Sequence, residues 1–509
     1  MFKYSLVITI IFSFFFISCN NDNFETVLSS GNLNFSKDTV FLDTVFTNIS
    51  SSTRTLKVYN KSNEHITIPS IKLGRGENSF YRLNVDGIAG KNFENIDILA
   101  KDSIFVFIEA TINHNMVVDP IYTDSIVFDA GVLQQDVKLV TLVQDAHFLF
   151  PQRDAQGVKE KIVLGIDAEG EEITVDGFYL DGNTKWEDDK PYVIYGYVGV
   201  PENTTLNIEK GTKIHFHQNS GLLVDKNASL KVNGILGDEV IFEGDRLEPE
   251  YSDIAGQWGT IWLRAGSRNH EIKNAIIKNN TLGILMDSIG SLTQPTLKIY
   301  NTQIYNTAMF GVLGRTANIK GENLVIGNNG MSSLACTIGG TYNFTHITLA
   351  NYWSSNVRDF PALLVNNFIK FTHTDGSESV LARDLNAANF TNIIIDGNQN
   401  IEMIVEKDDG ADFNYNFKNN LIKFIDENNN YSDNPLFDFE SVNHYQNNIL
   451  NGIPDFKSIE TNNFIIGEKS DAIDNADKNT ALQVPLDILG VGRITNPDIG
   501  AYQHIIFEE

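Results

Sequence analysis

The residues of this sequence best suited to binding a metal ion or a ligand lie in EGDRLEPEYSDIAGQW, residues 243–258. Carboxylate oxygens are the ligands that Ca²⁺ prefers, and the stretch supplies Glu243, Asp245, Glu248, Glu250 and Asp253. The basic side chains that follow could neutralise an acidic substrate and remove a proton beside its carboxylate; they are Arg264, Arg268 and Lys278. Neither group has the fixed spacing of a ligand set. Charged surface is therefore our preferred interpretation, with a calcium site as the alternative.

Aromatic residues lie within and just after the same stretch. Tyr251, Trp258 and Trp262 could stack on pyranose rings, because aromatic faces suit the faces of sugars. Trp258 and Trp262 are four residues apart on an expected strand, which would place them on one face. Together with Arg264 and Arg268 these three aromatic residues form the candidate ligand face of the sequence. Packing beneath the acidic stretch would explain the aromatic residues equally well.

Other reactive residue types do not form a catalytic set. His215 and His217 alternate in KIHFHQ, but no third metal ligand is evident, so we expect an outward-facing polar pair. Asp408 and Asp409 in EKDDGAD suit a solvated acidic turn. Cys336 lies between apolar neighbours in SLACTI, which predicts a buried and inert thiol. We therefore predict no catalytic residue and no metal site.

A repeat indicates the elements that position these residues. The pattern Asn-x-x-Ile-x-Asn opens at Asn274 and returns as NTQIYN and NLVIGN, with looser echoes in HITLAN, NNFIKF, NIIIDG and NNLIKF. Short β-branched runs precede it, and no segment in this half shows a helical period. A repeat of roughly 20 to 27 residues without helices predicts a solenoid in which each turn of chain supplies two or three strands.

Stacked turns of such a solenoid would pile like residues into columns. We expect an interior aliphatic column of Ile277, Ile304, Ile326, Leu349, Ile369, Ile395 and Ile422. Two residues later, where each coil bends, amides should donate to the neighbouring rung from Asn279, Asn306, Asn328 and Asn351. A scaffold is therefore the preferred role of these amides, and a ligand site is the alternative.

Residues 31–147 have a different pattern. Alternating runs such as TVFLDTVF, ITIPSIKL and DSIFVFIEATI are separated by turn residues, which predicts a two-sheet antiparallel sandwich. The region resembles the immunoglobulin-like modules that precede other domains in bacterial surface proteins, although it lacks the Cys…Trp…Cys spacing of true immunoglobulin domains. The resemblance implies a spacer or a contact surface without chemistry.

Residues 170–505 resemble a right-handed parallel β-helix of the pectin-lyase-like superfamily, and residues 150–161 form a plausible boundary before it. The resemblance rests on NTTLNIEKGTKIHF, SGLLVDKNASLKVNG and GQWGTIWLRAGSRNHEIKNAIIKNNTLGI, and on SDAIDNADK and DIGAYQ near the end. It implies an all-β chain in which an immunoglobulin-like β-sandwich precedes the solenoid. Polygalacturonase-type hydrolases of this fold carry paired aspartates with Gly-His-Gly and Arg-Ile-Lys motifs, and neither tripeptide is present.

The N-terminus resembles a bacterial lipoprotein signal. Lys3 and an apolar run precede Ser18 and Cys19, with FISC in the lipobox place and Phe16 where Leu is usual. The resemblance implies a signal peptide at residues 1–18 and an acylated Cys19 that anchors the chain in a bilayer. Residues 19–30 would form a polar, acidic tether, similar to the tags that place lipoproteins of Bacteroidota-type bacteria on the outer membrane surface. Loss of Cys19 to acylation leaves Cys336 without a disulfide partner.

The net charge of −27 and the isoelectric point of about 4.7 make nucleic acid an unlikely partner. We expect a surface-exposed protein anchored by lipid in the outer membrane, which binds carbohydrate or another surface ligand without catalysis. Its expected partners are the lipid bilayer, through Cys19, and a polysaccharide; the only cofactor considered is Ca²⁺. The alternatives are a polysaccharide lyase or glycoside hydrolase, and a structural or adhesive stalk.

Overall fold

The computed structural model describes residues 25–113, 120–288, 294–373 and 375–507. The chain forms two compact units, the first ending at Asp145 and the second beginning at Ala146. The predicted signal peptide at residues 1–18, Cys19 and the first part of the tether predicted at residues 19–30 lie outside the described residues. Within the described ranges, no helix has the length and the apolar character needed to cross a membrane.

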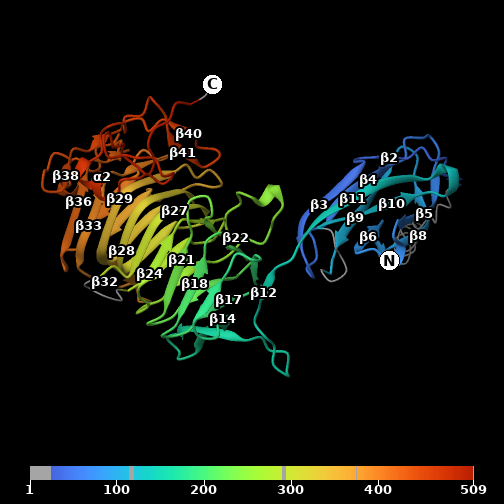
Figure 1. Cartoon of the computed structure of the whole chain (residues 1–509), viewed down its shortest axis with the longest axis horizontal. Coiled ribbons are helices and arrows are strands. Elements are labelled where there is room, and N and C mark those ends of the chain that lie inside the picture. The colour runs from blue at the N-terminus through green and yellow to red at the C-terminus, as the bar shows by residue number, and fades with distance from the viewer. Residues whose placement is uncertain (1–24, 114–119, 289–293, 374, 508–509) are drawn as a thin grey trace, which may run out of the picture. The chain divides into compact units, whose positions relative to one another are not determined.

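The first unit is a sandwich of two β-sheets (Figure 1). One sheet contains, in order, β1 (Val27–Leu28), β5 (Ile66–Leu73), β10 (Ile121–Phe128), β11 (Gln135–Gln144) and β3 (Thr39–Phe46), with β8 (Asn92–Ile98) paired to β5. The other contains β2 (Asn34–Phe35), β4 (Arg54–Tyr59), β9 (Ser103–Ala110), β6 (Tyr81–Val85) and β7 (Ile88–Gly90). Short 3-10 turns lie at η2 (Gly76–Asn78) and η4 (Gly131–Leu133).

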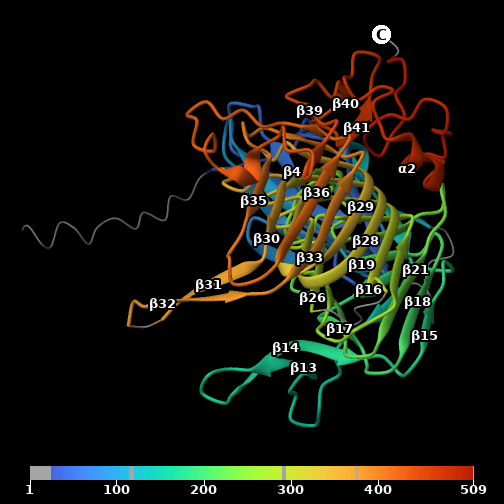
Figure 2. The same ribbon diagram turned by 90° about the vertical axis from the view of Figure 1, so that its left-hand side faces the viewer.

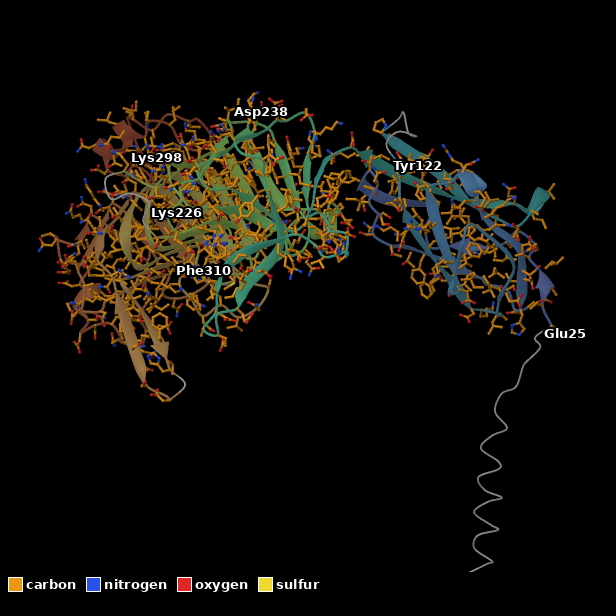
Figure 3. All side chains as sticks on the ribbon, turned by 90° about the horizontal axis from the view of Figure 1, so that it is seen from below. Glu25, Tyr122, Lys226, Asp238, Lys298 and Phe310 are labelled. Carbon is orange, nitrogen blue, oxygen red and sulfur yellow. The ribbon has the colours of Figure 1, made fainter. Side chains whose placement is uncertain are left out.

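The alternating runs of the sequence explain the core of this sandwich. Along β9, residues alternate between buried and solvent-facing positions, as a strand with one face against the core requires. Tyr81 and Tyr122, the latter labelled in Figure 3, are buried among the aliphatic side chains of both sheets. The sandwich is not wholly antiparallel as predicted, because β1 pairs parallel with β5 and β11 pairs parallel with β3.

The second unit is a parallel solenoid whose coils share one 26-stranded sheet (Figure 1). Each coil passes through three faces, which we call faces I, II and III. Face I contains β12 (His147–Leu149), β16 (Tyr192–Ile194), β19 (Lys213–Phe216), β22 (Val240–Gly244), β25 (Ala275–Lys278), β34 (Ile394–Gly397), β37 (Leu421–Ile422) and β39 (Ile449–Leu450). Because β12 already pairs with β16, the solenoid starts before the predicted residue 170.

The other two faces are built in the same way. Face II contains β14 (Glu172–Tyr179), β17 (Tyr197–Val200), β20 (Gly221–Val224), β23 (Ile261–Leu263), β26 (Ile284–Asp287), β30 (Leu363–Asn366) and β35 (Met403–Glu406). Face III contains β15 (Thr184–Trp186), β18 (Thr205–Glu209), β21 (Ser229–Asn233), β24 (His270–Lys273), β33 (Leu385–Thr391), β36 (Phe413–Lys418) and β38 (Tyr445–Gln446).

Three long strands bend through more than one face. They are β27 (Leu297–Thr307), β28 (Val312–Asn329) and β29 (Leu334–Asn351). The elements outside the three faces are β13 (Lys161–Ile166), η5 (Pro249–Tyr251), β31 (Phe368–Thr372), β32 (Glu378–Ala382), η6 (Pro435–Phe437), β40 (Phe456–Ser458), β41 (Asn463–Ile466) and α2 (Lys478–Gln483).

The predicted aliphatic column is confirmed except at one position. Ile277, Ile304, Ile326, Leu349, Ile395 and Ile422 are successive register partners on face I, and all are buried. Ile369 is the exception, because NNFIKF does not form a rung. Its residues begin β31, which pairs antiparallel with β32 in a hairpin that projects from the solenoid (Figure 2).

The repeated asparagines lie at the corners of the coils. Between faces III and I, the first residue of each motif that forms a rung has a positive φ: Asn274, Asn301, Asn323, His346, Asn392 and Asn419. Asparagine tolerates this left-handed backbone better than most residues. Its amide also reaches the next coil, as when Asn323 Nδ2 donates to Asn301 Oδ1 at 2.9 Å. The scaffold interpretation of these residues therefore agrees with their contacts.

The predicted column of amides two residues after the aliphatic column is only partly present. Asn279, Asn306 and Asn328 have positive φ values, and Asn306 Nδ2 donates to Asn279 Oδ1 at 3.5 Å. Asn462, from the C-terminal segment, bridges Asn306 and Asn328. Asn351 leaves the ladder: its side chain accepts from the backbone N–H of Asn329 and donates to the carbonyl of Met331.

The C-terminal segment packs along the outside of the coils. Phe464, Ile488 and Tyr502 cover Val325 and Ala350 on the outer side of face I. The buried Arg493 donates to Asn323 Oδ1 at 3.1 Å and to the carbonyl of Ala501 at 3.2 Å. This segment is therefore attached to the asparagine corner as well as to the sheet.

Replacing Ile326 by Ala should destabilise the solenoid by about 2–5 kcal/mol, because it opens a cavity in the interior column. The matched change Ile369→Ala should cost below about 1 kcal/mol, because that residue lies on the projecting hairpin. Urea unfolding followed by circular dichroism measures both values. Equal losses in the two variants would contradict the observed register.

Candidate functional site

The outer side of face II is the surface on which part of the predicted ligand face lies. Along β23, Ile261 and Leu263 point into the core, so Trp262 points outward. Trp262 pairs in register with Leu285 of β26, and Leu285 pairs with Leu313 of β28. These residues form an apolar column that crosses successive coils, in which Trp262 and Leu313 are half-buried and Leu285 is buried.

A polar column runs beside the apolar one. Arg264 follows β23, and Asp287 at the end of β26 is the register partner of Arg315. We call the six residues of the two columns the outer strip: Trp262, Leu285, Leu313, Arg264, Asp287 and Arg315. The coil architecture brings them together although the strip spans more than fifty positions of sequence.

Each arginine of the outer strip binds a carboxylate of an adjacent coil. Arg264 donates to Asp225 Oδ1 at 2.7 Å, and Arg315 Nε donates to Asp287 Oδ1 at 2.6 Å. The indole N–H of Trp262 donates to Asp287 Oδ2 at 2.6 Å, so this carboxylate holds both the guanidinium and the ring in place. The side chain of Arg315 is 42% exposed, which leaves guanidinium N–H groups accessible to a ligand.

Two hairpins rise from face II at different coils (Figure 2). The first consists of β13 and β14, and its Ile162 is buried against the positions of Gly177 and Gly199. The carbonyl of Leu164 in β13 accepts a hydrogen bond from Arg264 at 2.8 Å. The second hairpin, β31–β32, begins after β30. The outer strip lies on the coils between β14 and β30.

A groove of about 570 Å³ lies where the strands of face II begin. Tyr197, Thr260, Leu282 and Met309 are among its lining residues. A side chain at Gly259 would place its Cβ 2.2 Å from the Tyr197 hydroxyl, so glycine allows the ring to lie there. Burial raises the pKa of Tyr197, so the phenol stays neutral and available as a hydrogen-bond donor.

The prediction that Trp258 and Trp262 share a face is wrong. Trp258 precedes β23, forms an isolated parallel bridge with Asn280 and is buried in the core, where its ring stacks on Phe216 with centroids 4.4 Å apart. Its indole N–H donates to the carbonyl of Lys278 at 2.9 Å. Trp258 is among the residues that line the groove but is only 1% exposed, so the alternative interpretation, packing beneath the acidic stretch, describes it better.

The other members of the candidate ligand face are scattered. Tyr251 belongs to η5, where the guanidinium of Arg246 lies 3.8 Å from the centre of its ring. Arg268 is exposed in the turn before β24. Of the five predicted residues, only Trp262 and Arg264 lie together on the outer strip.

The carboxylates of the acidic stretch have separate partners. Glu243 forms an ion pair with Lys278 at 3.0 Å, Asp245 contacts His217 at 2.7 Å, and Glu248 pairs with Arg246. Asp253 accepts a hydrogen bond from Asn306 at 3.2 Å. Across the described part of the chain, no group of three His, Cys, Asp or Glu side chains is arranged to hold a metal ion.

The histidine pair differs from the prediction at one residue. His217 is exposed, as expected, but His215 is only 3% exposed and lies 3.5 Å from Glu243. The hydrogen bond with Asp245 raises the pKa of His217 above 6.5. Burial lowers the pKa of His215 below 6.5 and outweighs the attraction of Glu243. Each imidazole lies near a carboxylate, but the pKa values shift in opposite directions because His215 is buried within β19 and His217 is exposed just after it.

Two minor predictions are confirmed. Asp409 is exposed beside Lys407, and Asp408 accepts the backbone N–H of Gly410 in a solvated turn. Cys336 is fully buried, and burial raises the pKa of its thiol well above the usual range. The thiol is therefore inert.

A buried ion pair escaped the sequence analysis. Arg358 donates to both carboxylate oxygens of Glu402, at 2.8 and 2.5 Å, and both side chains are buried. Glu402 also accepts the backbone N–H groups of Ala362 and Gln399. The two charged residues are 44 positions apart in sequence, so no local pattern indicates the contact. The many hydrogen bonds of this ion pair indicate that it stabilises the fold.

Comparisons with known proteins add little to this description. No protein-family model matches the chain, and no curated protein matches it. A solved structure of a family 123 glycoside hydrolase from Clostridium perfringens shows a local likeness, with 12% identity and a TM-score of 0.15. The aligned part covers 22% of this chain and 26% of that chain, and a likeness at this level carries no argument about fold or activity.

An NMR titration of the histidine ring protons should find the pKa of His217 above 6.5 and that of His215 below it. Asp245→Asn should bring the pKa of His217 down towards 6.5, because the partner that favours the imidazolium is lost. The stabilisation from this contact should be complete below pH 6.5 and decline as the pH rises through the pKa of folded His217. Identical midpoints for the two histidines would contradict the assignment.

Proposed function

We propose that this is a lipid-anchored, surface-exposed protein whose solenoid binds carbohydrate or another surface ligand along the outer strip without catalysis. The observation that supports the proposal is the strip itself, in which Trp262 and Arg315 are fixed by one carboxylate, Asp287. The half-buried Trp262 ring, with the Arg264 guanidinium 5.8 Å from its centre, and the accessible guanidinium of Arg315 then lie side by side on a rigid sheet. Preorganised groups of this kind lower the entropic cost of binding an extended ligand.

The environment of the carboxylates argues against hydrolysis at this surface. A glycoside hydrolase uses one carboxylic acid to protonate the leaving oxygen and a second carboxylate as base or nucleophile. Asp287 belongs to the outer strip and Asp225 contacts it from the preceding coil, and each already accepts a hydrogen bond from an arginine. Both groups serve to position arginine side chains, which is a binding role.

The proposed anchoring rests on the sequence. Cys19 after an apolar leader resembles the acylated residue of bacterial lipoproteins, and several acyl chains together hold a protein on a bilayer. We further propose that the solenoid is a right-handed β-helix of the pectin-lyase-like type and that the sandwich is an immunoglobulin-like module. All-β composition and parallel pairing between coils support the first of these assignments.

Arg315→Gln and Trp262→Phe should each weaken binding to a polysaccharide that the protein binds by about tenfold. The first variant removes hydrogen-bond donors and the second removes part of a stacking surface, and a tenfold loss corresponds to about 1.4 kcal/mol of binding free energy. A glycan array followed by titration calorimetry on neutral and acidic polysaccharides measures the loss. Arg268→Gln is the matched control, since that arginine lies off the strip. Steady release of reducing ends or unsaturated uronates by the unaltered protein would replace the binding proposal with an enzyme.

Cys19→Ala should release the protein from the membrane fraction, because the acylation site is lost. Fractionation of the expressing bacteria, followed by immunoblotting, reports the distribution. Cys336→Ala is the control and should leave the distribution unchanged, because that thiol is buried. Retention of the Cys19→Ala protein in membranes would contradict the lipoprotein assignment.

A further inference from the structure

The outer side of face III carries a column of lysines and amides. Val232, Ile272 and Ile299 point into the core, so the residues that precede them on their strands point outward. Register pairing places the outward residues of six successive coils on one another, and we call them the lysine column: Lys231, Glu271, Lys298, Lys320, Asn343 and Asn389.

Two cations of this column are direct neighbours. Lys298, which is labelled in Figure 3, pairs in register with Lys320 on the next strand, and adjacent strands lie about 4.8 Å apart. Like charges in such a pair repel each other. Lys320 binds Glu322 at 2.6 Å, but among the residues that the structure describes no carboxylate forms an ion pair with Lys298. The protein therefore leaves one ammonium of this pair without a counter-charge.

Cations outnumber carboxylates on this face. Glu271 forms ion pairs with Lys231, at 3.9 Å, and with Lys273. The three lysines of the column and Lys273 thus meet two glutamates, Glu271 and Glu322, which leaves an excess of two positive charges in a chain of net charge −27. Burial lowers the pKa of Lys231, and repulsion from Lys298 and Lys273 lowers it further. The face is therefore locally basic.

A groove of about 450 Å³ lies over the next outward column of the same strands. Its lining includes Lys273, Tyr300 and Glu322, which are register partners on successive coils, and Leu486 and Gly490 of the C-terminal segment. Burial raises the pKa of Tyr300 to about 12, so its phenol stays neutral and can donate a hydrogen bond. The C-terminal segment thus forms a wall beside the basic face.

We propose that the lysine column binds a sulfated polysaccharide that lies along the axis of the solenoid, with sulfate groups against Lys298 and Lys320 and sugar hydroxyls against Asn343 and Asn389. The rise of one coil, about 4.8 Å, is close to the length of one sugar residue, so an extended chain can present a group to each coil. Asn389 Nδ2 donates to Asn343 Oδ1 at 2.8 Å, and the remaining amide groups of the two residues suit hydroxyls.

The type of cation favours sulfate over carboxylate. An ammonium acts as a point charge and can meet any oxygen of a tetrahedral anion, whereas a carboxylate is bound best by the planar fork of arginine, which the lysine column lacks. Salt screens the other carboxylates of the chain beyond about 8 Å at physiological ionic strength, so the local excess of positive charge dominates. The column lies on face III, so its binding does not depend on that proposed for the outer strip on face II.

Biolayer interferometry on immobilised dextran sulfate and on unsulfated dextran tests the proposal with the chain from Asn20 onwards. The unaltered protein should bind dextran sulfate and not dextran, and the dissociation constant should rise with salt. Lys298→Gln combined with Lys320→Gln should raise it at least about tenfold, because both cations are lost. Glu271→Gln should lower it, because the carboxylate that competes for Lys231 and Lys273 is removed.

The matched control combines Lys37→Gln with Lys72→Gln, which removes the same total charge from two exposed lysines of the sandwich. It should keep the dissociation constant of the unaltered protein, and thermal unfolding should show that all variants are folded. The proposal is overturned if dextran sulfate does not bind, if the Lys298 and Lys320 double variant keeps its affinity, or if the control loses as much. It is also overturned if polygalacturonate or single-stranded DNA competes as well as free dextran sulfate does.

Discussion

Parallel pairing of each coil with the next, without a shift in register on face I, is the constraint on which the rest of the solenoid depends. Ile277, Ile304 and Ile326 lie on one another because each strand pairs with the strand one coil later. A slip of one residue would turn Lys278 into the core and Ile277 towards solvent. Coils of unequal length keep this register because their extra residues leave the sheet, as β31 and β32 do.

The corners make such stacking feasible. A chain that turns sharply between two sheets needs residues with positive φ, and asparagine meets this need at low conformational cost. Its amide then satisfies polar groups that the turn leaves unpaired. At Asn323 and Asn392 these amides also bind the C-terminal segment, through the carbonyl of Leu486 and the backbone of Asp477. This one column of corner residues thus connects successive coils to each other and to the C-terminal segment.

The repeating elements could be predicted from the sequence. Contacts that depend on the position of another coil could not. The aliphatic column and the corner asparagines follow from local spacing, so they could be predicted. NNFIKF has the same local pattern, yet Ile369 pairs with Leu381 in a hairpin because the strand β32 is available after it. Trp258 is buried against Phe216 inside the solenoid, and His215 is buried although it alternates with His217; the spacing alone predicts neither outcome. The pair of Asp287 and Arg315 joins residues 28 positions apart, beyond the reach of a local motif.

The register also determines the electrostatics of the outer strip. Side chains at equivalent positions of adjacent coils are held about 4.8 Å apart, so opposite charges there form ion pairs and like charges would repel. Asp225 with Arg264, and Asp287 with Arg315, are such pairs. An anionic polymer would have to compete with these carboxylates for the guanidinium groups. A hydroxyl can instead accept from the remaining N–H groups while both ion pairs persist, so the strip suits a ligand rich in hydroxyls better than one rich in charge.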